Sequence, residues 1–293
     1  MLFKLKFPLM RKSSFLLLLL TLSLLAQSQV QVGIFGGISN YVGDMTEKAY
    51  KNSNGAFGIN ASYQILSRVS LRAGFTFAKV NGADSLIGQD DVRLRNLSFQ
   101  SNISEFSLVG EFNTFNMEYK RWSPYVFAGL AVYHFDPYTF DQQNNKVYLK
   151  PLRTEGEGLP GYAKSYSLTQ LALPFGGGIK YNISDNVRIA LEVGLRKLFT
   201  DYLDDVSGNY ADPNDLLTNV GQQSVDLSYR EDELINGNPF YPPKGETRGS
   251  PKYKDYYYLT GLHLTFTLPG SNNERSYNTK TGKNKRYGCP TVF

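Results

Sequence analysis

The sequence has few of the residue types that carry most enzyme and metal chemistry. Its 293 residues include one cysteine, two histidines and one tryptophan. The single cysteine, Cys289, excludes an intrachain disulfide and is either a free thiol or bonded to another molecule. Neither histidine, His134 or His263, lies in a serine-containing catalytic motif. These shortages weaken the case for an enzyme.

Long apolar runs are also missing, except at the start of the chain. Residues 1–28 contain four basic residues, then an apolar run over 15–25, and end in a small-x-small pattern, Ala26-Gln27-Ser28. This pattern predicts a secretory signal peptide that is cleaved after Ser28. No cysteine stands directly after that site, so a lipoprotein anchor is not expected. Beyond it, no apolar run approaches the roughly 18 residues that a membrane helix needs.

A strong net charge is absent from the mature chain. Removing the four basic residues of the signal peptide from the formal charge of +5 leaves +1, so nucleic acid is not an expected partner. The remaining charge is uneven, because residues 269–293 contain five basic residues against Glu274. We therefore expect a basic C-terminal tail over 269–293.

Apolar and polar residues alternate in much of the remaining sequence. In residues 69–78, Leu71 and Phe75 fall on one face of a strand, while Arg72 falls on the other. The strand over 123–135 is apolar on both faces, so its orientation stays open. Eight strands are predicted, over residues 29–38, 55–65, 69–78, 103–112, 123–135, 168–181, 186–196 and 256–268.

The connections between these strands alternate strictly between short and long. Three are short, over 66–68, 113–122 and 182–186, and four are long, over 39–54, 81–96, 136–165 and 200–255. Transmembrane barrels have short periplasmic turns and long exterior loops. The sequence thus predicts an all-β, eight-stranded up-and-down antiparallel transmembrane β-barrel over 29–268, with long extracellular loops. A soluble lipocalin-like barrel, with its apolar face inside, is the alternative.

Charged residues lie on the polar faces of the predicted strands. At eight strands the lumen is filled by side chains, so buried charges there must be paired. We expect a structural network of ion pairs in the lumen. Its members are Arg72, Glu105, Glu111, Lys180, Arg188, Glu192 and Arg196.

Three other motifs each have a structural and a functional interpretation. His134 beside Asp136 is at a predicted exterior rim, where a hydrogen-bonding role is favoured over catalysis. The run 176–178 of three glycines continues a strand, so it fits a barrel wall better than a phosphate loop. The stretch FTDYLDDVSGNY carries three clustered carboxylates without the spacing of a calcium loop. Turn and capping roles are favoured there over a calcium or partner site. These carboxylates are Asp201, Asp204 and Asp205.

Several stretches resemble a known family. They are GGISNYVGDM (36–45), RTEGEGLPGYAKSYSLTQLALPFGGGIKYNISDN (153–186), LEVGLRKLFTDYLDDVSGNY (191–210) and GCP (288–290). Together they resemble the PorG-like, DUF6089-type outer-membrane proteins of the type IX secretion and gliding machinery. The resemblance implies a non-enzymatic outer-membrane barrel, with both termini in the periplasm of a Gram-negative bacterium. It implies no cofactor and no small-molecule substrate.

The resemblance also implies partners. In that family the barrel associates with a periplasmic ring built from a lipoprotein, PorK or GldK, and its partner, PorN or GldN. The basic tail is either a disordered remnant or an arm that orders on a ring subunit. The candidate contact residues are Arg275, Lys283, Lys285, Arg286 and Cys289. A paralogue outside the secretion machinery, a surface adhesion or ligand-binding barrel, and a barrel enzyme that depends on His134 remain open alternatives.

Overall fold

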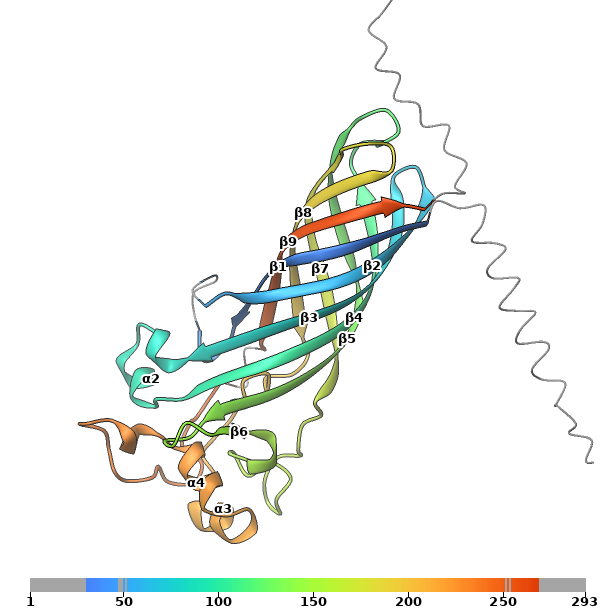
Figure 1. Ribbon diagram of the computed structural model, residues 1–293. Coiled ribbons are helices and arrows are strands. Elements are labelled where there is room, and N and C mark those ends of the chain that lie inside the picture. Colours follow the sequence, from blue (N-terminus) through green and yellow to red (C-terminus); the bar gives the residue numbers. More distant parts are fainter. Residues whose placement is uncertain (1–29, 47–49, 51, 251, 253, 269–293) are drawn as a thin grey trace, which may run out of the picture.

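The computed structural model describes residues 30–46, 50, 52–250, 252 and 254–268 (Figure 1). The signal peptide predicted over 1–28 and the tail over 269–293 lie outside these residues and stay predictions. None of the helices in the described part of the chain is long and apolar enough to cross a membrane.

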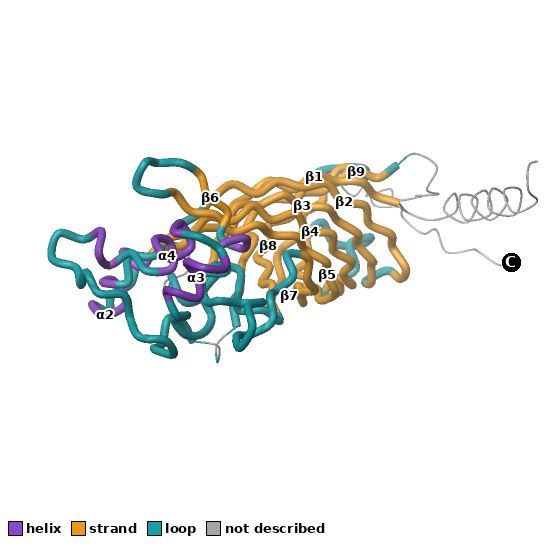
Figure 2. The backbone as a smooth tube through the Cα atoms, turned by 90° about the horizontal axis from the view of Figure 1, so that it is seen from below, coloured by secondary structure: helices purple, strands orange, loops and turns teal. Residues whose placement is uncertain are grey.

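The described residues form a closed antiparallel β-barrel (Figures 1 and 2). Eight strands make the ring, because β1 pairs with β9 and β4 pairs with β5. This confirms the predicted fold class. The ring strands are β1 (Val30–Val42), β2 (Asn54–Leu66), β3 (Val69–Ala83), β4 (Ser98–Asn113), β5 (Trp122–Phe140), β7 (Thr169–Asn182), β8 (Val187–Leu198) and β9 (Tyr256–Thr267). The short strand β6 (Lys146–Tyr148) pairs only with the end of β5 in the described sheet.

The two ends of the barrel differ in their connections. At one end, here called the turn end, short segments over 67–68, 114–121 and 183–186 join neighbouring strands. Residues 30 and 268, where the described chain starts and stops, lie at this same end (Figure 1). The long connections gather at the opposite end, here called the loop end. The predicted alternation of short and long connections is confirmed.

The alternating faces of the strands point apolar side chains outward and polar ones inward. Phe57 and Ile59 of β2 are 64% and 66% exposed, whereas Arg72 of β3 and Glu192 of β8 are buried. This arrangement excludes the lipocalin-like alternative, in which the apolar face would line the interior. Strand β5 is apolar on both faces because its inward residues, such as Tyr133, belong to the buried core.

Several strands extend beyond their predicted ends toward the loop end. Strand β4 begins at Ser98 and β3 continues to Ala83, so residues predicted as loop pair in a ladder. The extension is stable because the inward side chains there, Val80 and Phe99, are completely buried. Because the residues next to Val80 and Phe99 in the sequence are polar, the alternation pattern did not reveal that the strands extend this far.

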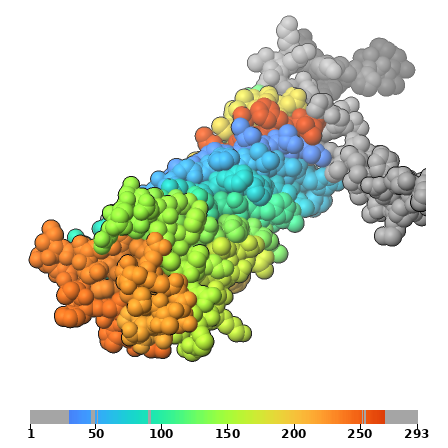
Figure 3. Space-filling view, turned by 60° about the horizontal axis from the view of Figure 1, so that its bottom comes forward, coloured from blue at the N-terminus to red at the C-terminus, as the bar shows by residue number. Residues whose placement is uncertain are grey.

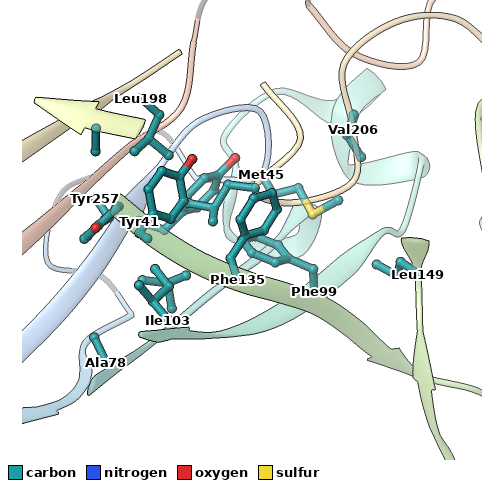
Figure 4. Close-up of a cluster of buried hydrophobic side chains, with 14 of the residues drawn as sticks. Tyr41, Met45, Ala78, Phe99, Ile103, Phe135, Leu149, Leu198, Val206 and Tyr257 are labelled. Atoms are coloured by element: carbon teal, nitrogen blue, oxygen red, sulfur yellow. The ribbon is translucent and has the colours of Figure 1, made fainter. Parts of the chain in front are cut away.

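The long connections fold into a compact structure over the loop end, here called the cap (Figure 3). It consists of the described residues of 43–53, 84–97, 141–168 and 199–255. A buried apolar cluster joins the cap to the barrel, with Tyr41, Met45, Phe99, Phe135 and Val206 among its members (Figure 4). Helices in the cap were not predicted. They are α2 (Asp90–Leu94), α3 (Pro213–Asn219), α4 (Gln222–Ser228) and the 3₁₀ turns Asp84–Leu86, Lys150–Leu152 and Glu231–Glu233.

Candidate functional site

Ion pairs fill the lumen near the turn end. Glu111 on β4 bridges two cations, with Arg72 Nε at 3.0 Å and Lys180 Nζ at 2.5 Å from its carboxylate oxygens. Arg72 Nη2 also lies 2.7 Å from Glu192 Oε2, and Tyr125 donates a hydrogen bond of 2.6 Å to the same oxygen. Strands β3, β4, β5, β7 and β8 therefore meet in one network across the barrel.

A second ion pair lies closer to the loop end. Arg196 Nε is 3.1 Å from Glu105 Oε2, and Tyr257 donates a hydrogen bond of 2.5 Å to that oxygen. Arg188, the seventh predicted member, instead donates to the side-chain oxygens of Asn182 and Gln31, at 2.8 and 3.1 Å. The structure thus brings six of the predicted lumenal charges into two groups, and places Arg188 among amides.

The sequence did not predict four other members of these two groups. His263 Nε2 lies 3.4 Å from Glu192 Oε2, and Asn60 Nδ2 lies 3.2 Å from His263 Nδ1. Tyr125 and Tyr257 supply the phenol donors. The inward parity of His263 on its strand was a usable signal, whereas Tyr125 lies on the strand whose two apolar faces were ambiguous.

The lumen retains little free space. Two cavities of about 20 Å³ each border Arg72 and His263. A volume of this size holds about one water molecule. The described interior is therefore packed with side chains and does not form a channel.

Glycines in the barrel wall make room for this packing. An added Cβ at Gly178 would lie 2.0 Å from Leu191 O and 2.9 Å from a ring carbon of Tyr125. At Gly176 it would lie 2.2 Å from Val193 O and 2.9 Å from Phe127 Cζ. The run 176–178 is part of β7 and lets two aromatic rings lie against the wall, in place of a phosphate-binding loop.

His134 lies on the outer face of β5 and is exposed. Its Nδ1 is 2.9 Å from Thr169 Oγ1 on the neighbouring strand β7. Asp136 is half-buried two residues further on. The position of His134 fits a hydrogen-bonding residue of the wall.

The three clustered aspartates are buried in the cap and have separate partners. Asp201 Oδ2 accepts a hydrogen bond of 3.0 Å from Ser207. Asp204 accepts from Tyr41 at 2.5 Å, and Asp205 accepts from Thr154 at 2.6 Å. Among the described residues, no group of three or more acidic, histidine or cysteine side chains has the arrangement of a metal site.

A buried arginine holds the cap segments together. Arg248 forms an ion pair of 3.1 Å with Glu155 and donates hydrogen bonds to the backbone oxygens of Asp205 and Ser228, at 2.8 and 3.1 Å. Glu155 in turn accepts from the backbone N–H groups of Ser207 and Gly208, both at 2.9 Å. This centre was not predicted, because Arg248 lies in a stretch without periodicity.

Burial of so many carboxyl groups changes their acidity. Burial raises the pKa of Asp201 to about 7. Burial, together with the nearby charge of Asp205, raises the pKa of Glu157 to about 8. For Asp205, burial raises the pKa to about 6, although the charge of Arg248 opposes the shift. Several cap carboxyls therefore titrate near neutral pH instead of near pH 4.

Comparison with solved structures gives distant likenesses of fold. Ail, the attachment invasion locus protein of Yersinia pestis, crystallised with the heparin analogue sucrose octasulfate, aligns at 10% identity with a TM-score of 0.41, covering 83% of this chain and 99% of Ail. The N-terminal β-barrel domain of Pseudomonas aeruginosa OprF aligns at 13% identity with a TM-score of 0.36, covering 83% of this chain and 100% of that domain. Neisserial surface protein A aligns at 10% identity with a TM-score of 0.39, covering 83% of this chain and 97% of that protein. These alignments are too distant to support an inference about function.

Sequence comparison identifies the family. A search of curated proteins finds no significant match. A family model described as a domain of unknown function, DUF6089, matches residues 11–218, which include the barrel strands β1 to β8 and the carboxylate stretch of the cap. That match covers more than half of the sequence, and the chain therefore belongs to the DUF6089 family.

Proposed function

We propose that this protein is a non-enzymatic outer-membrane barrel that fixes a periplasmic protein ring to the membrane, as a component of the type IX secretion and gliding machinery. The observation that carries the proposal is a closed barrel with an apolar outer wall and a filled lumen. Protein partners can reach such a barrel only at its two ends.

The outer wall supports placement in a bilayer. Large apolar side chains on every ring strand are exposed, including Leu130 at 61% and Phe266 at 43%. Soluble monomers rarely expose contiguous apolar patches larger than a few hundred Å². A closed barrel leaves no unpaired strand edge, which the hydrocarbon region requires.

The filled lumen favours an anchoring role over transport through the barrel. Paired charges such as Arg72 on β3 and Glu192 on β8 cross the lumen, and Met117 in the segment 114–121 is buried at the turn end. Met117 O also accepts a hydrogen bond of 3.3 Å from Asn182. The turn end is thus a structured surface at which a partner can dock.

Stretches that resemble the PorG-like proteins meet in the cap. Tyr41 of GGISNYVGDM contacts Asp204 of the stretch 191–210. Thr154 and Glu155, from the stretch that begins at residue 153, contact Asp205 and Ser207 in the same region. Residues far apart in the sequence therefore form one structural unit.

The partners of the proposed complex follow from the resemblance. They are a PorK- or GldK-like lipoprotein and a PorN- or GldN-like protein. With residues 30 and 268 at the turn end, a periplasmic ring would meet this end and the basic tail over 269–293. We propose that the basic side chains of the tail pair with acidic residues of a ring subunit.

Deletion of residues 270–293 tests this proposal. We expect the truncated barrel to insert in the outer membrane but to lose the ring proteins in a crosslinked pull-down, because the tail supplies the ionic contacts. Alanine at Arg275, Lys283, Lys285 and Arg286 should have the same effect. Alanine at Asn272, Asn273, Asn278 and Asn284 is the matched control and should retain the ring. Unchanged recovery of the ring by the truncated barrel would refute the role of the tail.

A surface-binding barrel is the second candidate, because the cap exposes apolar side chains at its surface. Ile235 is fully exposed and Phe240 is 77% exposed. A partner of this kind should bind intact cells, and Ile235→Ser together with Phe240→Ser should abolish that binding without affecting insertion. Cells that bind no partner would exclude this candidate.

A further inference from the structure

Two carboxyl groups and one phenol meet in the cap. The hydroxyl of Tyr41 lies 2.5 Å from Asp204 Oδ2 and 3.0 Å from Asp255 Oδ1. All three side chains are at most 2% exposed. They come from the end of β1, from the connection after β8 and from the residue before β9. This group of three, here called the Asp-Tyr-Asp triad, joins the cap to the barrel rim.

The hydrogen count of the triad requires an additional proton. A phenol hydroxyl carries one hydrogen, and ionised carboxylates can only accept. Both oxygens lie within hydrogen-bond distance of the phenol, so one contact needs a second hydrogen from a carboxyl group. The other carboxyl oxygens are already acceptors, since Asp204 Oδ1 receives Val206 N–H and Asp255 Oδ2 receives Leu203 N–H, both at 2.9 Å. The additional proton therefore belongs on Asp204 Oδ2 or Asp255 Oδ1.

We propose that the cap is closed by this one buried proton, shared within the Asp-Tyr-Asp triad, and that the cap loosens when the proton leaves at alkaline pH. Loss of the proton would leave two buried carboxylates facing one phenol oxygen. The resulting repulsion acts between Asp204, in the connection after β8, and Asp255, the residue directly before β9, whose backbone oxygen accepts from Leu198 N–H at the barrel rim.

Charges around the triad act in both directions. Asp44 lies near Asp204 and Asp201 lies near Asp255, and both negative charges favour retention of the proton. Arg95 opposes this at Asp204, but its guanidinium is bound to Asp84 at 2.6 Å.

More distant groups complete the surroundings. Lys254 and Glu155 act on Asp201 with opposite signs, and Glu155 is paired with Arg248. The negative charge of Asp255 also acts on the hydroxyl group of Tyr133.

The predicted direction of the pH effect follows from the burial of the triad. Burial raises the pKa of Asp204 and of Asp255 well above the usual range for aspartate. An acid whose pKa is raised in the folded state contributes stability at low pH, and this contribution is lost as pH rises through the folded-state value. The closed cap should thus lose stability as pH rises from the open-state pKa to the raised closed-state pKa, and it should be most open on the alkaline side. Between these two values the equilibrium constant for opening should rise about tenfold per pH unit for one proton, and above the closed-state pKa it should level off.

The backbone beside the triad is fitted closely to it. A Cβ placed on Gly43 would lie 2.1 Å from both Tyr41 Oη and Asp255 Oδ1. A side chain at this position would therefore separate the phenol from the carboxyl. Gly43→Ala should disrupt the triad without changing any titratable group.

Two readouts on the purified full-length barrel in lipid nanodiscs, with EDTA present, test the proposal. The infrared spectrum at neutral pH should show the C=O stretch of protonated carboxyls. Asp204→Asn or Asp255→Asn should remove one component of that band, while the component from other protonated cap carboxyls such as Glu157 should remain. The second readout is a spin-label distance between the cap at Thr218 and the turn end at Asp185, in a Cys289→Ser background. The distribution of this distance should be narrow at neutral pH and should broaden at alkaline pH.

Variants separate the triad from general effects of pH. Asp204→Asn keeps a neutral donor beside Tyr41, so its cap should stay closed at alkaline pH. Asp255→Asn serves the same purpose if the first variant does not fold. Asp212→Asn makes the same chemical change at a cap residue outside the triad, and should open like the wild type. A protonated-carboxyl band that neither Asp204→Asn nor Asp255→Asn reduces, or identical opening of all variants, would overturn the proposal.

Discussion

Single residues in the lumen matter because each buried charge depends on its partners. Glu111 holds Arg72 and Lys180 with both of its oxygens, and Ser70 donates a further hydrogen bond of 2.9 Å. A buried ion pair adds little stability compared with apolar residues of the same shape. Removal of one partner is costly because it leaves the other charge unpaired.

Glu111→Ala should therefore destabilise the barrel by about 3–5 kcal/mol. Unfolding in denaturant, followed by tryptophan fluorescence from Trp122, measures the change. Glu118→Ala, at an exposed glutamate of the segment 114–121, is the control and should change stability by at most about 0.5 kcal/mol. Equal stability of the two variants would contradict the described lumenal network.

At the scale of elements, the cap behaves as a folded unit attached to the barrel rim. Arg248 connects Glu155, Asp205 and the end of α4, so the connections 141–168 and 199–255 share one buried charge centre. The stacked rings of Tyr166 and Tyr202, with centroids 4.7 Å apart, link the same two connections. The cap should accordingly open as one cooperative segment.

Arg248→Ala should raise hydrogen exchange across 199–255 while the ring strands stay protected. The expected loss is about 3–5 kcal/mol of local opening free energy, because Glu155 would remain buried without its partner. Lys244→Ala removes an exposed ion pair of 3.3 Å with Asp215 and should cost no more than about 1 kcal/mol. Faster exchange in the ring strands as well would show that cap and barrel are not separate units.

Strands were far easier to predict from the sequence than the cap. Alternation and loop length sufficed for the ring, because a strand between an apolar outer wall and a lumen has a period of two at nearly every residue. The cap has no such period. Its stability comes from contacts such as Tyr41 with Asp204, which are 163 residues apart in the sequence. The aspartates were therefore recognised as a cluster, but their separate partners were not predictable.

The whole molecule has two ends of opposite character, separated by an apolar wall. The turn end consists of short segments and is where residues 30 and 268 lie, whereas the loop end carries the buried carboxyl groups of the cap (Figure 1). If the protein anchors a periplasmic ring, the ring must contact the turn end. The cap should face the exterior and be free of ring proteins.

In vivo photocrosslinking from the two ends tests this account most directly. A photoreactive amino acid at Tyr119, an 83% exposed residue of the turn end, should crosslink to the ring lipoprotein or its partner. The same amino acid at Ile235, a fully exposed residue of the cap, should give no such product. Ring proteins captured from Ile235 and absent from Tyr119 would contradict the account.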